Sequence, residues 1–402
     1  MIVMLYKILE IFDRIVQLVL PKDANAVCYV SSPDYTDNAF YMYRHILQNR
    51  SNLCHVWLVA DISIADRIRK EFDLLSNPDQ YNSLLVFKKH SLSGYFRHLR
   101  CRNVFHTHGA YSYSRAEAGR NVVNLWHGMP IKCIGRLNLV SPNPRPTFGT
   151  LHIATSHLFK YIIAAAFNAP PEKVLVSGLP RCDFLKSGPH KEAARSALLK
   201  RLGICGDRKI VLWMPTYRTE DAGSSAGTAA GFRSFLNDMK PETLQKIDGL
   251  ASVNNCTVVV KLHPYDGLNR VDPPRGLKSI RFINSLEWAK SGAQLYDFIA
   301  ITDGLISDVS SVLIDYLVTA KPAAILAFDE RMYSRDLTIP VDLLRKSGCF
   351  HFLGDDVSLQ NYFQKVAAVE SCGESEDAAM RDLFYDSRLA DSCGSILQEI
   401  GL

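Results

Sequence analysis

Short apolar runs, separated by stretches of helical character, recur along most of the chain and constrain its fold more than any other feature. The runs are rich in valine, isoleucine and leucine, and they lack the strict alternation of apolar and polar residues that marks a sheet with one wet face. This pattern is typical of strands buried on both sides of a parallel sheet, and the intervening helices predict a doubly wound α/β fold. The predicted strands are 27–31, 56–60, 84–87, 104–106, 122–126, 152–154, 174–176, 210–214, 257–262, 280–283, 305–307 and 323–328.

The length of the chain and one interruption of this pattern predict two domains. A chain of 402 residues fits two domains of roughly 150–200 residues each. Gly188 and Pro189 break the pattern, so we expect an N-terminal Rossmann-like domain over residues 1–188 and a C-terminal one over 189–402, facing each other across a cleft. Ligands of such folds bind at the carboxyl ends of the strands, so residues that directly follow strands are the candidates for a site.

Charge, cysteine spacing and absent motifs narrow the function classes. The net charge of +5 is too small to predict binding to nucleic acid. The ten cysteines include no C-x-x-C pair, which argues against zinc-ribbon and thioredoxin-type sites and favours reduced thiols in the cytoplasm. No G-x-x-x-x-G-K-[ST] run occurs and no G-x-G-x-x-G follows a strand, which argues against P-loop NTPases and nicotinamide dehydrogenases.

The first 20 residues are apolar-rich but contain charges such as Lys7, Asp13 and Arg14. A bilayer-spanning helix needs about 20 predominantly apolar residues, so this segment is not predicted to span a membrane. Its apolar residues fall at helical spacing and predict an amphipathic helix, which either packs on the body of the protein or lies on a membrane surface. Packing is favoured, because the polar face is not rich in lysine and arginine.

A histidine at a strand end is the first candidate for chemistry. His127 follows a predicted strand and precedes Gly128, which allows close approach of a ligand or of backbone. An imidazole with a pKa near 6.5 is suited to remove a proton from an alcohol at neutral pH, although a purely structural histidine remains the alternative. His106 and His108 could join His127 around a metal, but no acidic partner has ligand-like spacing, so no metal site is predicted.

The second half carries groups suited to an anionic ligand. Arg218 follows a strand and offers a planar fork of donors for phosphate oxygens. His263 also ends a strand and could neutralise charge on a leaving phosphate. Ser310 and Ser311 precede a helix, where hydroxyls and free amides form an anion site or a plain N-cap. Asp315 lies on the same helix face as Ser311, either toward a ligand hydroxyl or at the helix surface.

Taken in order, these segments resemble the CDP-glycerol glycerophosphotransferase family, whose members build teichoic acids and related phosphate-linked capsule polymers of bacteria. The resemblance extends over roughly residues 27–333 and departs from the family pattern at Met129 and Ile131. The segments that carry it are 126–132, 215–218, 263–264, 307–311 with Asp315 and Pro322, 178–183, and the region 37–57.

The resemblance implies a GT-B-like fold and assigns roles to individual residues. His127 would be the general base on the acceptor hydroxyl, and His263 would act on the leaving pyrophosphate. The donor-side residues would be Arg218, Thr216, Lys261, Ser310 and Ser311 for the pyrophosphate of a CDP-alditol, with Asp315 on the alditol or ribose. The acceptor-side residues would be Lys132, Arg181 and Asp183.

The implied reaction is attack of an acceptor hydroxyl on the β-phosphate, releasing CMP. Glycerol phosphate or ribitol phosphate would pass to a saccharide, lipid-linked or polyol-phosphate acceptor, at the inner face of the cell membrane. No cofactor is required, and Mg²⁺ held through the substrate phosphates is compatible with the residues. A departure from the family pattern at 334–340 leaves the alditol open, and the lack of a long extra N-terminal domain predicts addition of one or a few units.

Two other functions are also compatible with the sequence. A GT-B glycosyltransferase would transfer the sugar of a nucleotide sugar rather than a phosphate. A non-catalytic, membrane-associated scaffold would keep the fold without turnover.

Overall fold

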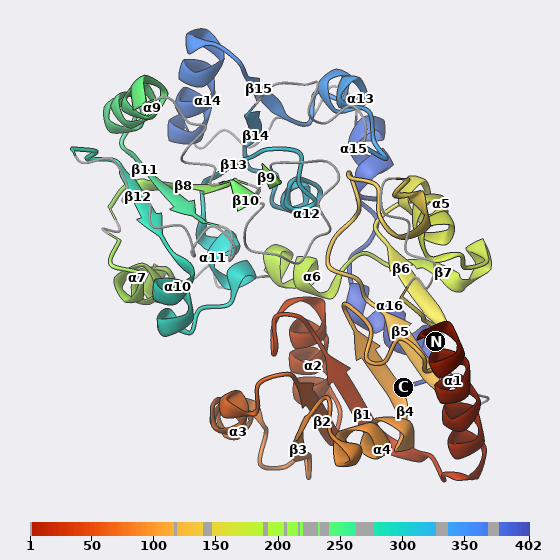
Figure 1. Ribbon diagram of the computed structural model, residues 1–402. Helices are drawn as coiled ribbons and strands as arrows, with labels where there is room; N and C mark the ends of the chain where they lie inside the picture. The colour runs from red at the N-terminus through yellow and green to blue at the C-terminus, as the bar shows by residue number, and fades with distance from the viewer. Residues whose placement is uncertain are drawn as a thin grey trace.

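A computed structural model describes residues 2–115, 119–139, 147–187, 192–204, 207–215, 218–219, 232–233, 241–262, 276–326, 337–368 and 378–402. Two parallel sheets, each flanked by helices, make up two lobes (Figure 1). The first sheet has seven strands in the order β3-β2-β1-β4-β5-β6-β7. These strands are β1 (Asp23–Val30), β2 (Cys54–Val59), β3 (Ser83–Lys88), β4 (Cys101–His106), β5 (Asn121–Asn124), β6 (Leu151–Ala154) and β7 (Val174–Val176).

The second sheet has six strands in the order β12-β11-β8-β13-β14-β15. They are β8 (Lys209–Met214), β11 (Cys256–Lys261), β12 (Ile280–Ile283), β13 (Gly304–Ser307), β14 (Ala323–Leu326) and β15 (His351–Leu353). A separate antiparallel pair joins β9 (Arg218–Thr219) to β10 (Phe232–Arg233).

The apolar runs predicted as strands all coincide with strands of the two sheets, and the predicted α/β, GT-B-like fold class is confirmed. The central strands are buried on both faces, as their lack of alternation indicates; all four residues of β13 are buried. Strand β15 was missed, because its three residues begin with a histidine and include no valine or isoleucine, unlike the equally short edge strand β7.

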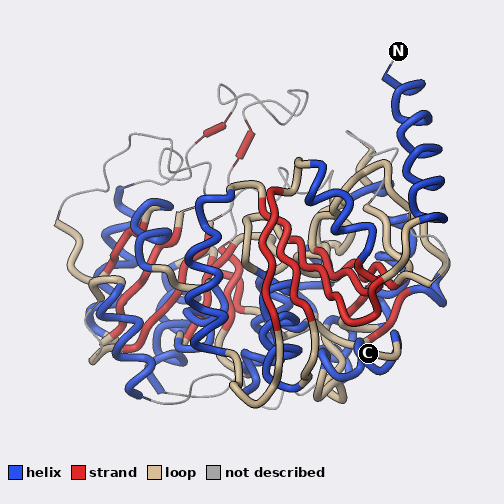
Figure 2. The backbone as a smooth tube through the Cα atoms, turned by 90° about the horizontal axis from the view of Figure 1, so that it is seen from below, coloured by secondary structure: helices blue, strands red, loops and turns tan. Residues whose placement is uncertain are grey.

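The helices lie between the strands in chain order and cover the sheets (Figure 2). In the first half they are α1 (Ile2–Val19), α2 (Asp37–Asn49), α3 (Ala65–Leu75), α4 (Leu92–Arg100), α5 (His157–Phe167), α6 (Pro180–Ser187) and α7 (Glu192–Arg201), with short 3-10 turns η1 (Ile62–Ile64), η2 (Gly135–Leu137) and η3 (Pro171–Lys173). In the second half they are α9 (Pro241–Val253), α10 (Ser285–Ser291), α11 (Leu295–Ile301), α12 (Val312–Tyr316), α13 (Val341–Lys346), α14 (Asp356–Ala368), α15 (Ala378–Phe384) and α16 (Ser392–Ile400), with the turn η6 (Leu317–Thr319).

The strand order of each sheet reverses once, and the two reversal points locate the site. In the first sheet the chain passes from β1 outward to β3 and then returns to β4 beside β1. In the second sheet the corresponding reversal lies between β8 and β13. Loops diverge at such points and leave a crevice outside the carboxyl ends of the strands, which is where ligands of doubly wound folds bind.

The C-terminal segment returns to the first lobe, where α15 and α16 lie against its helices (Figure 1). The hydroxyl of Thr155 donates to the carbonyl of Phe384 at 2.6 Å, and the amide of Asn121 donates to the carbonyl of Ile400 at 3.0 Å. The second half of the chain is therefore not confined to the second sheet. The predicted domain boundary between residues 188 and 189 falls outside the described residues and stays a prediction.

Helix α1 packs on the first lobe through its polar stripe. Asp13 and Gln17 are almost fully buried; Asp13 accepts a hydrogen bond from the Tyr95 hydroxyl at 2.7 Å, and Gln17 accepts one from Arg120 at 2.8 Å. The apolar stripe faces outward, and the helix stands out at one corner of the molecule (Figure 2). Among the described residues, no helix is both long enough and apolar enough to cross a bilayer.

Candidate active site

His127 lies on the turn that follows β5, the neighbour of β4 in the first sheet and thus one strand beyond the reversal between β1 and β4. The backbone of the turn is unusual, because Trp126 has a φ of +48° and Gly128 a φ of +123°. The side-chain amide of Asn38, on α2, donates to the carbonyls of Leu125 at 3.3 Å and Trp126 at 3.0 Å. These hydrogen bonds stabilise the turn, which offsets the unfavourable positive φ of Trp126.

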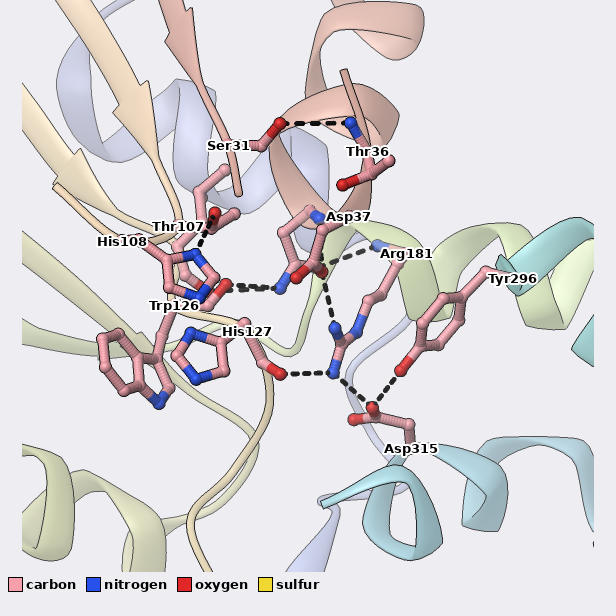
Figure 3. A network of polar contacts seen from close by, with 12 residues as sticks. Ser31, Thr36, Asp37, Thr107, His108, Trp126, His127, Arg181, Tyr296 and Asp315 are labelled. Carbon is pink, nitrogen blue, oxygen red and sulfur yellow. Dashed lines mark hydrogen bonds and ion pairs between the residues drawn. The ribbon is translucent and has the colours of Figure 1, made fainter. Parts of the chain in front are cut away.

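The imidazole of His127 is enclosed by two other rings (Figure 3). It stacks face to face on His108, with ring centroids 4.0 Å apart and planes only 5° apart, and its centroid lies 3.9 Å from that of Trp126. The Thr107 hydroxyl is 2.8 Å from Nδ1 of His108 and orients that second ring. His108 was predicted from the sequence only as a candidate metal ligand. Its stacking could not be predicted from spacing, because β4 and β5 become neighbours only in the sheet.

Burial lowers the pKa of His127 to about 3, and the neighbouring His108 adds to the shift. Asp37 opposes it, while Arg181 reinforces it. The ring is therefore unprotonated at neutral pH, which is the form that a general base requires. An anionic ligand beside the ring would favour its protonated form and raise this pKa toward neutrality.

Gly128 lies where the two lobes meet. A methyl group added at its Cα would lie 2.6 Å from Oγ of Ser311 and 2.7 Å from Nη2 of Arg181, both closer than atoms of a real side chain approach. The turn that carries His127 therefore contacts the Ser-Ser segment at the reversal point of the second sheet. Only glycine allows this approach, and its positive φ is a second reason for glycine here.

Arg181, at the start of α6, connects the two lobes from a buried position (Figure 3). It donates to Asp37 at 2.5 Å and to the carbonyl of His127 at 3.1 Å in the first lobe, and to Asp315 at 2.5 Å in the second. Its guanidinium also lies over the ring of Tyr296, 4.4 Å from the centroid. Burial would lower the pKa of Arg181, but the carboxylates of Asp315 and Asp37 outweigh it, and the pKa is raised well above its usual value.

Asp315, predicted to meet an alditol or ribose, has no exposed surface in this structure. Its Oδ2 accepts hydrogen bonds from Arg181 and from the Tyr296 hydroxyl, both at 2.5 Å. Tyr296 was not predicted from the sequence, because a tyrosine in an apolar helix carries no local signal of this role. Asp315 therefore belongs to the connection between the lobes in this conformation, and its contact with a ligand stays a prediction.

The other acceptor-side predictions lie in different surroundings. Asp183 accepts from the Ser392 hydroxyl at 2.6 Å and from the Cys393 amide at 2.9 Å, so it satisfies the first turn of α16. The backbone of Lys132 pairs with Leu337 in an isolated bridge. The structure thus directs the Asp183 carboxylate toward the N-terminus of α16.

Two of the donor-side predictions come close to the lobe junction. Ser310 and Ser311 precede α12, and Ser311 contacts Gly128 as described. The hydroxyl of Ser311, at the N-cap of α12, makes no side-chain cap bond. The Ser311 hydroxyl thus lies at a helix start beside the turn of His127.

Lys261 ends β11, and its ammonium lies over the ring of Trp288, 5.2 Å from the centroid. Burial lowers the pKa of Lys261 to about 8, so the group remains largely protonated at neutral pH. Within the described part of the chain no carboxylate forms an ion pair with it. Such a cation is suited to an anionic ligand.

The remaining predictions fall outside what the structure describes: this holds for His263, for Thr216 and for the side chain of Arg218, whose backbone begins β9. Among the described residues, no three histidine, cysteine or acidic side chains come close enough together to hold a metal ion. A role for Mg²⁺ stays an open prediction.

Comparison with known proteins gives one family over nearly the whole chain. The model of the family described as CDP-Glycerol:Poly(glycerophosphate) glycerophosphotransferase matches residues 13–400. The teichoic acid ribitol-phosphate polymerase TarL of Staphylococcus aureus is 30% identical over 183 residues, which are 44% of this chain and 29% of that protein. The teichoic acid glycerol-phosphate transferase of the same organism is 24% identical over 226 residues, 53% of each chain. The chain matches less than two thirds of the length of either relative.

A solved structure supports the fold. A variant of the wall teichoic acid polymerase TagF, soaked with CDPG, superposes with a TM-score of 0.69 and 18% identity, covering 94% of this chain and 89% of that one. At this identity the likeness concerns the arrangement of the two sheets.

Proposed function

Because the chain belongs to the CDP-glycerol:poly(glycerophosphate) glycerophosphotransferase family, we propose that it transfers glycerol phosphate or ribitol phosphate from a CDP-alditol to an acceptor hydroxyl, releasing CMP. The relatives named above include a ribitol-phosphate polymerase and a glycerol-phosphate transferase, so both alditols are carried forward. The acceptor is a saccharide, lipid-linked or polyol-phosphate chain of a teichoic-acid-like or capsular polymer.

The observation that carries the proposal is the contact of Gly128 with Ser311. It brings the turn of His127, the proposed base, against the helix start proposed to hold the donor phosphates. In the proposed step the His127 imidazole accepts the proton of the acceptor hydroxyl, while the oxygen of that hydroxyl bonds to the β-phosphorus of the donor. The bond from that phosphorus to the bridging oxygen breaks, and CMP leaves with the bridging oxygen.

The donor side supplies positioning and charge in this proposal. Backbone amides at the start of α12 and the hydroxyls of Ser310 and Ser311 hold phosphate oxygens, and the Lys261 cation adds charge. His263, Arg218 and Thr216 act on the same phosphates. Phosphoryl transfer depends mainly on positioning and on stabilisation of charge, which these residues supply in the proposal, and Mg²⁺ would enter with the substrate.

The test compares products. The protein is incubated with CDP-glycerol or CDP-ribitol and an acceptor; released nucleotide is identified by chromatography and the acceptor's mass gain by mass spectrometry. CMP with a gain of one alditol phosphate supports the proposal, whereas CDP identifies a GT-B glycosyl-type transfer instead. His127→Ala is expected to lose turnover, and His157→Ala, at an exposed position on α5, is the matched control. Full turnover by the His127 variant would contradict the assignment of the base.

We further propose that α1 makes peripheral contact with the cell membrane. The outward stripe consists of apolar residues that are half exposed or more: Ile8, Ile11, Phe12, Ile15, Leu18 and Val19. Lys7 and Arg14 are exposed at its border, while Asp13 is buried beneath. An apolar stripe bordered by cations suits an interface with anionic lipids.

Flotation with phosphatidylglycerol-containing vesicles tests this contact. Ile11→Asp with Ile15→Asp is expected to reduce the vesicle-bound fraction strongly, because carboxylates resist burial among acyl chains. Leu74→Asp, at an exposed apolar residue on α3, is the matched control and should leave binding unchanged. Equal binding by all variants would refute the role of α1.

A further inference from the structure

A cavity of about 870 Å³ lies beneath α1, at the carboxyl ends of β3 and β4. Its walls come from α1, from the start of α4 and from the loop that follows β4. Ligand sites in proteins are commonly cavities of about 300–1,000 Å³. The place is the one where a doubly wound sheet binds its ligands, next to the reversal between β1 and β4.

The charge of the cavity wall has one sign. Lys89, Arg115 and Arg120 line it, and none of the described lining residues is aspartate or glutamate. Arg120 is buried, and its guanidinium donates hydrogen bonds to the side chain of Gln17 and to the carbonyls of Cys101 and His98. The Lys89 ammonium donates to the carbonyl of Gly109 at 3.1 Å, which leaves two further donors for a ligand. Such a wall favours an anionic occupant.

Aromatic rings line the same cavity. The centroids of Tyr111 and Tyr113 lie 5.3 Å and 6.1 Å from that of Tyr95, and the hydroxyl of Tyr111 donates to the carbonyl of Lys89 at 2.5 Å. Tyrosine offers an apolar ring and a polar edge, which suits a chain of carbons bearing hydroxyl groups. The wall thus combines cations for phosphate with rings for the carbon backbone of a polyol or sugar.

His108 joins this cavity to the site. It lines the cavity, and its ring stacks on His127 with centroids 4.0 Å apart. The end of an acceptor chain that lies in the cavity is therefore separated from the proposed base His127 by the ring of His108. The donor-side residues Ser310 and Ser311 belong to the other lobe and do not line the cavity.

We propose that this cavity is the acceptor subsite and that it holds a phosphate-bearing polyol segment of the acceptor, with Lys89 contacting a phosphate. The proposal rests on the proposed function for the identity of the reaction, but binding to the cavity is measurable without turnover. A volume of about 870 Å³ exceeds that of one glycerol phosphate unit, so the cavity takes several units behind the reacting hydroxyl.

The experiment uses a soluble glycerol phosphate trimer as the probe and the full-length protein. Titration calorimetry measures binding of the trimer and, separately, of CDP-glycerol. Lys89→Gln removes a cation from the wall, and Ser112→Trp fills the cavity from an exposed position. Lys88→Gln is the matched control, because it removes the same charge one residue earlier at an exposed site outside the cavity.

We expect both cavity variants to weaken trimer binding about tenfold or more, as loss of a charge-assisted contact or of space does. CDP-glycerol should bind as in the unaltered protein, and Lys88→Gln should change neither value. Absence of trimer binding to the unaltered protein, or equal binding by the cavity variants, overturns the proposal. Weakened binding of CDP-glycerol by both variants also overturns it, since the cavity would then belong to the donor.

The proposed reaction can be refuted independently of the proposed cavity site. If trimer binding depends on Lys89 but no CDP-alditol yields CMP, the cavity is retained as an anion-binding subsite and the proposed reaction is refuted.

Discussion

The replacement Arg181→Met probes the connection between the lobes. It removes the guanidinium that contacts Asp37, the carbonyl of His127 and Asp315, and keeps an unbranched apolar side chain in its place. Among the described residues, the Asp315 carboxylate, which has no exposed surface, would then keep the Tyr296 hydroxyl alone as a partner. Removing one partner of a buried ion pair costs about 3–5 kcal/mol, because the other charge stays buried without compensation.

An exposed ion pair provides the comparison. Arg388 lies 2.6 Å from Asp386, but its side chain is 78% exposed, so Arg388→Met should cost about 0–1 kcal/mol. Urea denaturation followed by circular dichroism gives the free energy of unfolding of both variants at pH 8. The two arginine replacements should therefore differ by roughly 2–5 kcal/mol. Turnover should fall only in Arg181→Met, because the His127 turn loses a support.

The pH dependence gives the result that would refute the reasoning. Burial raises the pKa of Asp315, and the guanidinium opposes the rise. Without Arg181 the folded pKa rises further above the unfolded value of about 3.9, so the folded state of the variant binds a proton more readily than the unfolded state. The variant should therefore lose stability relative to the unaltered protein as pH rises from 5 to 8. A loss below about 1 kcal/mol at pH 8, or an equal loss at both pH values, would refute the buried-pair account.

Three further predictions concern the site. The pKa of His127 near 3 keeps the ring neutral above that pH. If His127 is the base, the acid limb of the pH profile of kcat/KM, which reports on the free enzyme, should therefore lie well below pH 6.5. An acid limb at pH 6.5 would contradict the burial of the ring. Gly128→Ala should destabilise the fold by about 1–3 kcal/mol and depress turnover, since its methyl group would lie 2.6 Å from Ser311; unchanged melting and turnover would disprove the contact. Asp183→Ala should cost about 1 kcal/mol in denaturation, because the Cys393 amide and the Ser392 hydroxyl at the start of α16 lose their acceptor, with little effect on KM for the acceptor substrate. A raised KM with unchanged stability would instead support the predicted acceptor role.

The strands and the order of the motifs could be predicted from the sequence because both are local. Burial on two faces demands an uninterrupted apolar run, and such runs are visible without knowledge of their neighbours. The segments that follow them, at His127 and at Ser310–Ser311, could then be assigned to strand ends, and parallel sheets bring such ends to one edge. The short edge strand β15 has no comparable apolar run, so it was not predicted.

The orientation of α1 was only half predictable. Its spacing predicts two faces, but not which face meets the body. The structure buries Asp13 and Gln17 because Tyr95 and Arg120, from α4 and from the segment before β5, offer them hydrogen bonds. The apolar face remains outside.

What the sequence determined by itself is thus a doubly wound α/β chain with its reactive side chains at strand ends. The tertiary structure alone decided which of them meet. Arg181 and Asp315 are 134 positions apart and belong to different lobes, yet they form one buried pair beside the turn of His127. His108 stacks on His127 because β4 and β5 are neighbours in the sheet. Such contacts depend on which surfaces fold together, and no local pattern of residues encodes them.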